Sequence, residues 1–138
     1  IFIILTSYIY IINLLKDTEK SYPLILALTS TLFYRDFKKE YGQLKALYIG
    51  IFWTLGSVIL PSIIHDNTYE ILLHPNIYIP NFLLMFGSSN LIDINDIDED
   101  REAGVLTLPV LLGKNNSEIL TSVCSVLSVV IYLTNFNF

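Results

Sequence analysis

The chain has 138 residues, of which 53% are hydrophobic and only 15% charged, and its mean hydropathy is +0.57. This balance excludes an ordinary soluble domain, in which roughly a quarter of the residues are charged. The net charge of -5 is also uneven, because six of the thirteen acidic residues fall between Asp93 and Glu102. The composition predicts an integral membrane protein with one local acidic site.

Five apolar segments predict an all-α, multi-pass transmembrane bundle. Several are shorter than the roughly 20 residues that cross a bilayer core, so tilted helices or embedded ends are needed. Because the chain begins and stops within or beside apolar segments, we expect residues 1–138 to be a single incomplete domain, about five helices of a larger bundle. The segments are Ile1–Leu15, Tyr22–Phe33, Ala46–Ile64, Ile77–Ile92 and Ile119–Phe136.

Prolines suggest where two of these helices begin. Ser21 is the type of residue that caps a helix, and it precedes Tyr22-Pro23, so we expect the second helix to begin there. Pro80 is expected near the start of the fourth helix, where a missing N–H costs least.

The polar connections predict which side of the membrane each faces. When the segments alternate across the bilayer, six of the eight basic residues fall on one side, and only Lys16 and Lys20 fall on the other. The positive-inside rule then assigns the face with Arg35–Lys45 and the acidic stretch to the cytoplasm, or to the stroma or matrix of an organelle.

The acidic stretch follows the fourth segment and has the spacing of a ligand set. Asp93, Asp96 and Asp100 lie at i, i+3 and i+7, so on a continuing helix their carboxylates share one face. Asn90 extends this face toward the membrane. Clustered carboxylates repel one another unless a cation neutralises them, and hard oxygen ligands suit Mg²⁺.

A solvated acidic loop and an EF-hand loop are the two alternative interpretations of this stretch. Asp98 and Glu99 point away from the shared face and are expected to stay solvated, and the whole stretch could be a solvated acidic loop. An EF-hand loop is excluded, because Arg101 stands where that motif needs Gly and Thr107 where it needs Glu.

Tyr34 and Lys38 form a second candidate pair. They are four residues apart at a helix end that faces the same side as the acidic stretch. Without the resemblance described next, an interfacial tyrosine anchor and a snorkelling lysine explain them better than a functional pair does.

Both motifs resemble those of the UbiA superfamily of intramembrane prenyltransferases. Residues 90–113, NLIDINDIDEDREAGVLTLPVLLG, are similar to the second Asp-rich motif of that family, D-x-x-D-x-x-x-D-R-x-x-G-x-x-T-L-P-V-x-x-G. Tyr34-Arg-Asp-Phe-Lys38 resembles its Y-x-x-x-K motif, and the following Leu44-Lys45-Ala46 resembles its lysine-bearing start of the next helix. The segments would correspond to the third to seventh family helices. The family's first Asp-rich motif is missing, so we expect only half of the metal site and no catalysis by this chain alone.

The resemblance implies a reaction and a set of roles. A prenyl group would pass from a prenyl diphosphate to a lipophilic acceptor within the membrane, with Mg²⁺ as cofactor; the acceptor could be a quinone precursor, a chlorin or a glycerol lipid. No nucleic-acid partner is expected. Gly104 would allow the turn after the motif, and Pro109 and Gly113 would shape the connection that follows. The implied site residues are Asp93, Asp96 and Asp100 for Mg²⁺, Lys38, Asn90 and Arg101 for the substrate, and Tyr34 with Lys38 for catalysis.

The main alternative is a non-enzymatic membrane subunit or transporter segment with an acidic cation site. Such a protein should carry acidic residues inside its apolar segments, whereas here they gather at the end of one segment. A purely structural ion-binding protein would leave Tyr34 and Lys38 unexplained.

Overall fold

The computed structural model describes residues 5–7, 9, 13, 18–65 and 68–135, and all of its regular structure is helical within those ranges. This confirms the all-α prediction. Two of the elements are not α-helices: η1 is a 3₁₀ turn and η2 is a π-helix. The elements are α2 (Thr18–Glu40), η1 (Gly42–Leu44), α3 (Lys45–Thr54), η2 (Leu55–Ile59), α4 (Leu60–Ile64), α5 (Thr68–Leu73), α6 (Pro75–Asn95), α7 (Ile97–Glu102), α8 (Leu108–Leu112) and α9 (Lys114–Asn135).

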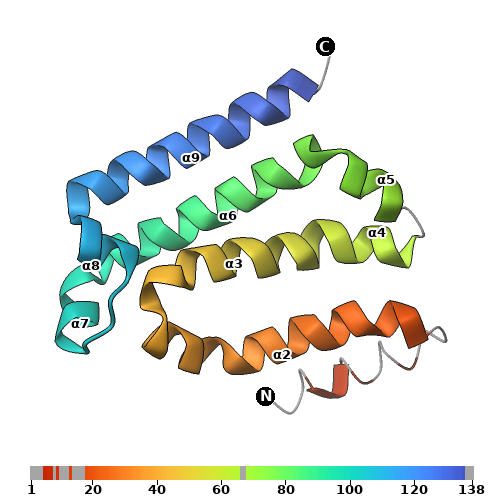
Figure 1. The fold of residues 1–138 in the computed structure, drawn as a ribbon, viewed down its shortest axis with the longest axis horizontal. Helices are drawn as coiled ribbons and strands as arrows, with labels where there is room; N and C mark the ends of the chain where they lie inside the picture. The colour runs from red at the N-terminus through yellow and green to blue at the C-terminus, as the bar shows by residue number, and fades with distance from the viewer. Residues whose placement is uncertain (1–4, 8, 10–12, 14–17, 66–67, 136–138) are drawn as a thin grey trace.

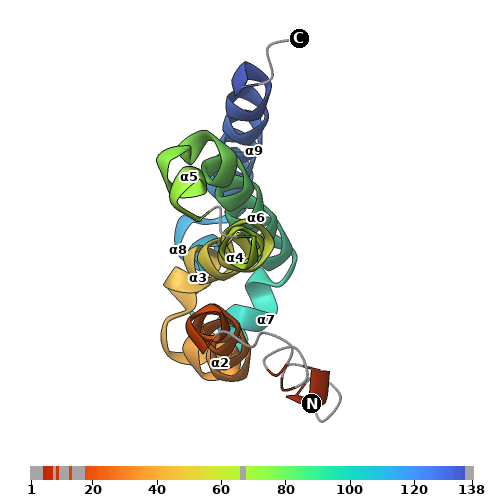
Figure 2. The same ribbon diagram turned by 90° about the vertical axis from the view of Figure 1, so that its right-hand side faces the viewer.

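The long helices form a layer one helix thick. Figure 1 shows α2, the continuous α3–η2–α4 rod, α6 and α9 side by side in chain order, and Figure 2 shows the same helices stacked when seen along the layer. Each packs against its neighbours in the sequence, most extensively α6 on α9 and α3 on α6. The arrangement leaves many large apolar side chains exposed on both faces of the layer, as expected for a protein that meets lipid.

Among the described residues, two helical stretches are long and apolar enough to cross a membrane by length and composition, Gly42–Ile63 and Lys114–Asn135. The helices α2 and α6 are of similar length to these two stretches, with 23 and 21 residues. Charged or amide side chains at their ends, however, lower their hydropathy. The segment predicted at Ile1–Leu15 lies largely outside the described residues.

Both predicted helix starts were wrong. The helix α2 already begins at Thr18, and α6 begins at Pro75, so Ser21 and Pro80 lie inside helices. The helical hydrogen bonding therefore continues through the polar residues before each apolar segment. Pro75 takes the N-terminal position that needs no donor, and the carbonyl of Pro80 accepts a hydrogen bond from Ser128 Oγ on α9 at 2.7 Å.

The connections between the described helices lie at two opposite ends of the layer. At the left of Figure 1 lie η1, between α2 and α3, and the α7–α8 segment, between α6 and α9. At the other end lies α5, between α4 and α6. The charged residues singled out by the sequence therefore meet at one end of the layer.

Candidate active site

The acidic stretch is not one continuous helix, so the predicted single face is wrong in detail. The helix α6 ends at Asn95, and Asp96 has φ -101° and ψ 9° before α7 begins at Ile97. The amide of Asp96 still donates to the carbonyl of Asp93 at 3.2 Å, which makes a tight turn. Asn and Asp favour such breaks because their side chains compete with helical backbone bonds.

The break separates the acidic residues by burial. Asp93 and Asp100 are 1% and 5% exposed, whereas Asp96 is half-buried and Asp98 and Glu99 are exposed. Two carboxylates therefore enter the interior from opposite sides of the turn. The expectation that Asp98 and Glu99 face solvent is confirmed by their exposure.

Each buried carboxylate is paired with a lysine from the connection between α2 and α3. Lys38 Nζ lies 2.8 Å from Asp100 Oδ1, and Lys45 Nζ pairs with Asp93 Oδ1. Lys38 comes from the last turn of α2 and Lys45 from the first residue of α3. The two ion pairs bring together segments that are far apart in the sequence.

Lys45 was missed as a site residue by the sequence reasoning. It is only 6% exposed, which is rare for lysine unless it is paired. The one feature of the sequence that could have indicated Lys45 is its position. It is a lysine at the first turn of an apolar helix, on the side of the acidic stretch. That position is equally typical of a lysine that snorkels to the membrane surface.

Two pKa shifts follow from this packing. Burial raises the pKa of Asp93 above its usual range, and the Lys45 ammonium opposes this only in part. Burial alone would lower the pKa of Lys38, but the hydrogen bond and charge of Asp100 outweigh it, with a further contribution from the charge of Asp93, so the pKa is raised. Lys38 therefore stays positively charged, and the negative charges of both Asp93 and Asp100 favour its protonated form.

Two glycines shape the connections that carry these residues. Gly104 has φ +71° and ends α7 in a Schellman turn, in which the amides of Gly104 and Val105 donate to the carbonyls of Arg101 and Asp100. Gly42 is buried, and a Cβ there would lie 3.0 Å from the backbone of Leu106. The absence of a side chain at Gly42 thus lets the lysine-bearing turn contact the chain just after the acidic turn.

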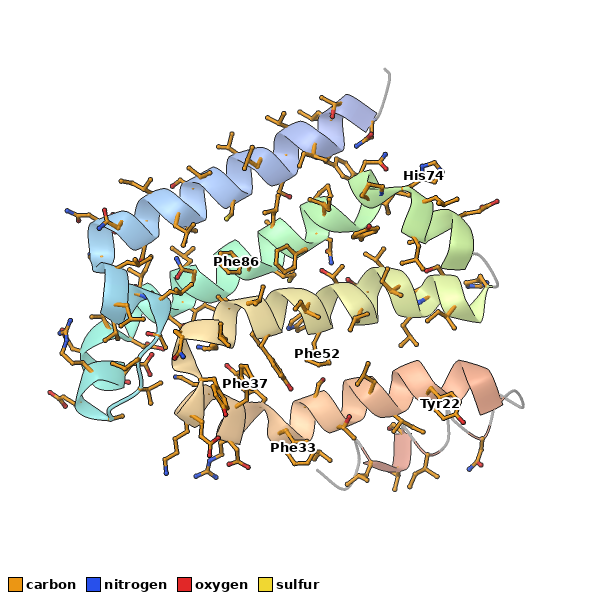
Figure 3. The ribbon with its side chains drawn as sticks, viewed as in Figure 1. Tyr22, Phe33, Phe37, Phe52, His74 and Phe86 are labelled. Atoms are coloured by element: carbon orange, nitrogen blue, oxygen red, sulfur yellow. The ribbon has the colours of Figure 1, made fainter. Side chains whose placement is uncertain are left out.

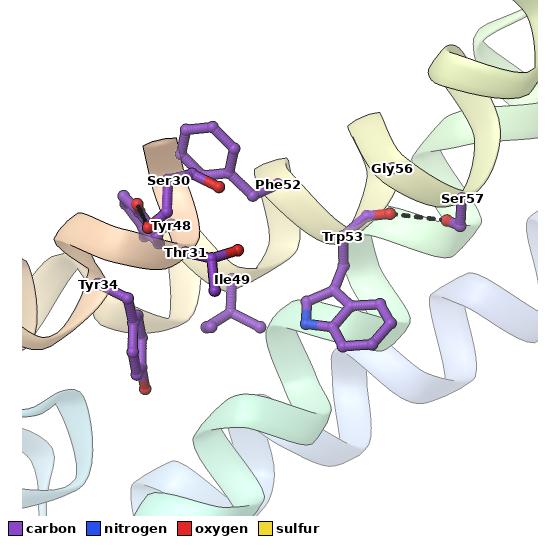
Figure 4. Close-up of a pocket in the computed structure, with 9 residues that line it drawn as sticks. All are labelled: Ser30, Thr31, Tyr34, Tyr48, Ile49, Phe52, Trp53, Gly56 and Ser57. Atoms are coloured by element: carbon purple, nitrogen blue, oxygen red, sulfur yellow. Dashed lines mark hydrogen bonds between the residues drawn. The ribbon is translucent and has the colours of Figure 1, made fainter. Parts of the chain in front are cut away.

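Tyr34 lies one helical turn before Lys38 and lines a cavity of 510 Å³ between α2 and α3. Figure 4 shows the Tyr34 ring, which comes from α2, and the Trp53 ring, which comes from α3, among the residues that line this cavity. Its wall also contains Tyr48, whose ring lies 6.1 Å from that of Tyr34 and 4.5 Å from that of Phe52, centroid to centroid. The charged end of the layer therefore adjoins a large aromatic and apolar space.

Comparison with protein families shows which family the chain belongs to. A model of the UbiA prenyltransferase family matches residues 2–138. The chain belongs to the UbiA prenyltransferase family. A comparison with curated proteins and one with solved structures found no match. As a UbiA chain it is an integral membrane protein built as a multi-pass helical bundle, with prenyltransferase activity at the level of the family.

In this UbiA chain, the residues fit part of a metal site. Within the described ranges, no group of three or more His, Cys, Asp or Glu side chains is arranged to hold a metal ion alone. However, Asp100 Oδ2 is buried without a hydrogen-bond partner, and carboxylate oxygens are the donors that Mg²⁺ prefers. Magnesium usually takes one or two protein carboxylates and completes its shell with water and substrate phosphate, so Asp93 and Asp100 fit that role.

The remaining predicted substrate residues lie at the edges of the site. Arg101 is exposed and pairs with Asp98 at 2.9 Å on the outer side of α7. Asn90 is completely buried, and its amide donates to the carbonyl of Ser117 at 3.1 Å and to Thr121 Oγ1 at 2.9 Å. Its amide group thus ties α6 to α9, while Asn90 Oδ1 has no partner among the described residues. The assignments of Asn90 and Arg101 to substrate stay predictions.

Proposed function

We propose that this chain forms part of an enzyme that transfers a prenyl group from a prenyl diphosphate to a lipophilic acceptor in the membrane, with Mg²⁺ as cofactor. The observation that supports this best is the double pairing of Lys38 with Asp100 and Lys45 with Asp93 beside an apolar cavity. Paired charges one helical turn from an apolar cavity suit a ligand with a diphosphate head and a hydrocarbon tail.

The reaction breaks the bond between C1 of the prenyl group and the diphosphate oxygen. Both electrons of this bond leave with the diphosphate, the acceptor supplies the pair that forms its new bond to C1, and the acceptor loses a proton. The bond breaks only if the charge that develops on the diphosphate is stabilised. Bound Mg²⁺ would supply Lewis-acid stabilisation of that charge.

The protein side chains have distinct roles in this proposal. Asp93 and Asp100 would hold the cation, with Asp96 as the third predicted ligand, and Lys38 would donate to the diphosphate oxygens. The phenol ring of Tyr34 would stabilise the positive charge of the reacting carbon through its π-face. The apolar cavity excludes water, which would otherwise capture the carbocation.

The chain supplies one set of carboxylates, and we propose that a first Asp-rich motif in the full-length protein supplies the other. Residues 1–138 are then one incomplete domain of the bundle. We also propose that the end with the ion pairs faces the cytoplasm, stroma or matrix. The acceptor is a quinone precursor, a chlorin or a glycerol lipid.

An acidic ion path through the membrane is the rival function. It requires carboxylates along the spans, whereas the buried carboxylates with a described side chain, Asp93 and Asp100, both lie at one end and pair with lysines. The structure therefore offers no support for this rival.

The test uses the full-length protein, a radiolabelled prenyl diphosphate and each class of acceptor. Asp100→Asn and Asp93→Asn are expected to lower kcat/KM at least 100-fold, and removing Mg²⁺ with EDTA should abolish product until Mg²⁺ is restored. Asp98→Asn is the matched control, because Asp98 is an exposed acid of the same stretch, and its kcat/KM should stay within about twofold. Full activity of Asp100→Asn, or activity in EDTA, would refute the metal assignment.

A further inference from the structure

The aromatic cavity beside Tyr34 shares two wall residues with a second cavity of 460 Å³. The first is lined by Ser30, Tyr34 and Tyr48, and the second by Tyr22, Leu26 and Ile63, among others. Phe52 and Gly56 belong to the walls of both. Both cavities lie between α2 and the α3–η2–α4 rod, and the two together are called the groove.

This groove begins at the charged end of the layer. The residues of α2 that face it, Tyr34, Ser30, Leu26 and Tyr22, lie four residues apart and continue the stripe that starts at Lys38. From Lys38 to Tyr22 this stripe runs about 24 Å along the helix. Figure 3 shows Phe37 at one end of α2, Tyr22 at the other, and Phe52 on α3 between them.

Gly56 lies where the two cavities meet. It belongs to the π-helix η2, Leu55–Ile59, and π-turns inside α-helices are frequent at functional sites. A Cβ on Gly56 would meet nothing within 4 Å, so the space in front of its backbone is open. Any larger side chain at Gly56 would project into the passage between the cavities without a clash against the protein.

Hydrogen bonds from α6 reach the rod on both sides of Gly56 in the sequence. Asn81 donates to Thr54 Oγ1 at 3.2 Å and to Ser57 Oγ at 2.9 Å, and Ser57 Oγ donates to the Trp53 carbonyl at 2.7 Å. These bonds fix the rod on both sides of Gly56. The passage is therefore a built feature of the fold.

We propose that the groove holds the hydrocarbon tail of the prenyl diphosphate and that Gly56 sets the tail length the enzyme accepts. This inference rests on the proposed transferase function. With the diphosphate at Lys38, a short tail ends in the first cavity, and a longer tail passes Gly56, about 12 Å beyond Tyr48 along the rod, into the second cavity. The combined volume is that of a lipid-sized ligand site.

The test compares geranyl, farnesyl, geranylgeranyl and solanesyl diphosphate as donors for the wild type, Gly56→Leu and Ile51→Phe. Gly56→Leu is expected to lose at least tenfold in kcat/KM for the longest donors that the wild type uses, and to keep the geranyl value within about threefold. Ile51→Phe is the matched control, because Ile51 is exposed on the same rod and lines neither cavity, and its donor profile should not change.

The outcomes distinguish the proposed role of Gly56 from the proposed transferase function. A wild type that uses only geranyl diphosphate, or a Gly56→Leu variant that loses equally with every donor, would overturn the role of Gly56 while leaving the transferase intact. A wild type that turns over no donor contradicts the transferase function. In that case, photolabelling by a prenyl diphosphate with a terminal diazirine decides the inference, since it should label residues 55–63 in the wild type and not in Gly56→Leu.

Discussion

Lys45 and Asp93 show how strongly one residue pair determines this site. Both side chains are almost fully buried, at 8% and 2% exposure, so each charge depends on the other for its compensation. Breaking a buried pair by removing one partner leaves the second charge without compensation, which costs far more than the intact pair contributes. The pair therefore holds the start of α3 to the end of α6.

Replacing Lys45 by Met is expected to destabilise the protein by about 3–5 kcal/mol, because the Asp93 carboxylate stays buried and unpaired. The measurement is the thermal midpoint in detergent. Lys39→Met is the control, since Lys39 is exposed, and its midpoint should not move. Adding Asp93→Asn to Lys45→Met should recover much of the loss, and a double variant no more stable than Lys45→Met would contradict this account.

Replacing Lys38 by Met should act on substrate binding as well as on folding. The pair is open on the lysine side, but the Asp100 side chain is only 7% exposed, so leaving this carboxylate without its partner should cost about 1–3 kcal/mol in stability. Loss of a charge-assisted bond to the diphosphate should raise KM for the donor about 10-fold to 100-fold. Lys38→Arg keeps the charge and should recover part of the affinity. An unchanged KM for Lys38→Met would show that Lys38 serves the fold alone.

At the scale of elements, the turns around the site matter more than the helices. The break at Asp96 and the positive φ of Gly104 fold α7 back so that Asp100 faces the same interior as Asp93. A straight helix would have carried Asp100 away from the layer along the axis of α6. The turn at Asp96 thus lets two carboxylates of one motif occupy buried positions next to the two lysines.

Gly104 and Gly56 provide a matched pair for testing this. A Cβ at either position meets nothing within 4 Å, but only Gly104 has a positive φ. Gly104→Ala is expected to destabilise the protein by about 1–2 kcal/mol through backbone strain, and to speed hydrogen exchange in residues 97–106. Gly56→Ala should be neutral or stabilising by up to about 1 kcal/mol, because alanine suits a helix better than glycine. Equal effects of the two would refute the strain argument.

The link between α6 and α9 through Asn90 can be tested without touching the charged residues. Thr121→Val removes one of the two acceptors of the Asn90 amide and should cost about 0.6 kcal/mol, the usual value for a hydrogen bond between membrane helices. KM for the donor should not change. If Asn90→Ala raises KM while Thr121→Val does not, Asn90 also contacts the substrate, as the sequence resemblance implies.

At the scale of the whole molecule, the helices follow one another in a single layer, and this places every connection at one of two ends. The ion pairs occupy one end, and His65, at the end of α4, lies at the other, where the chain leads to α5. Labels attached at the two ends can therefore show the orientation of the protein in its membrane.

Cysteine labelling tests the proposed orientation. In a background with Cys124→Ser, Glu102→Cys and His65→Cys place thiols at exposed positions at opposite ends. A membrane-impermeant maleimide should label Glu102→Cys only from the cytoplasmic, stromal or matrix side, and His65→Cys only from the other side. The opposite pattern would overturn the orientation, and labelling of both from one side would contradict the helix crossings.

The sequence alone determined the class of fold and indicated the family. Continuous apolar segments allow only helices in a bilayer, and the spacing of Asp93, Asp96 and Asp100 with Tyr34 and Lys38 resembled the family that the comparison then showed. The tertiary structure decided which groups meet. It turned the chain at Asp96, buried Lys45 against Asp93, and opened a groove past Gly56. These outcomes depend on packing between residues far apart in the chain, and local sequence patterns carry no record of such contacts.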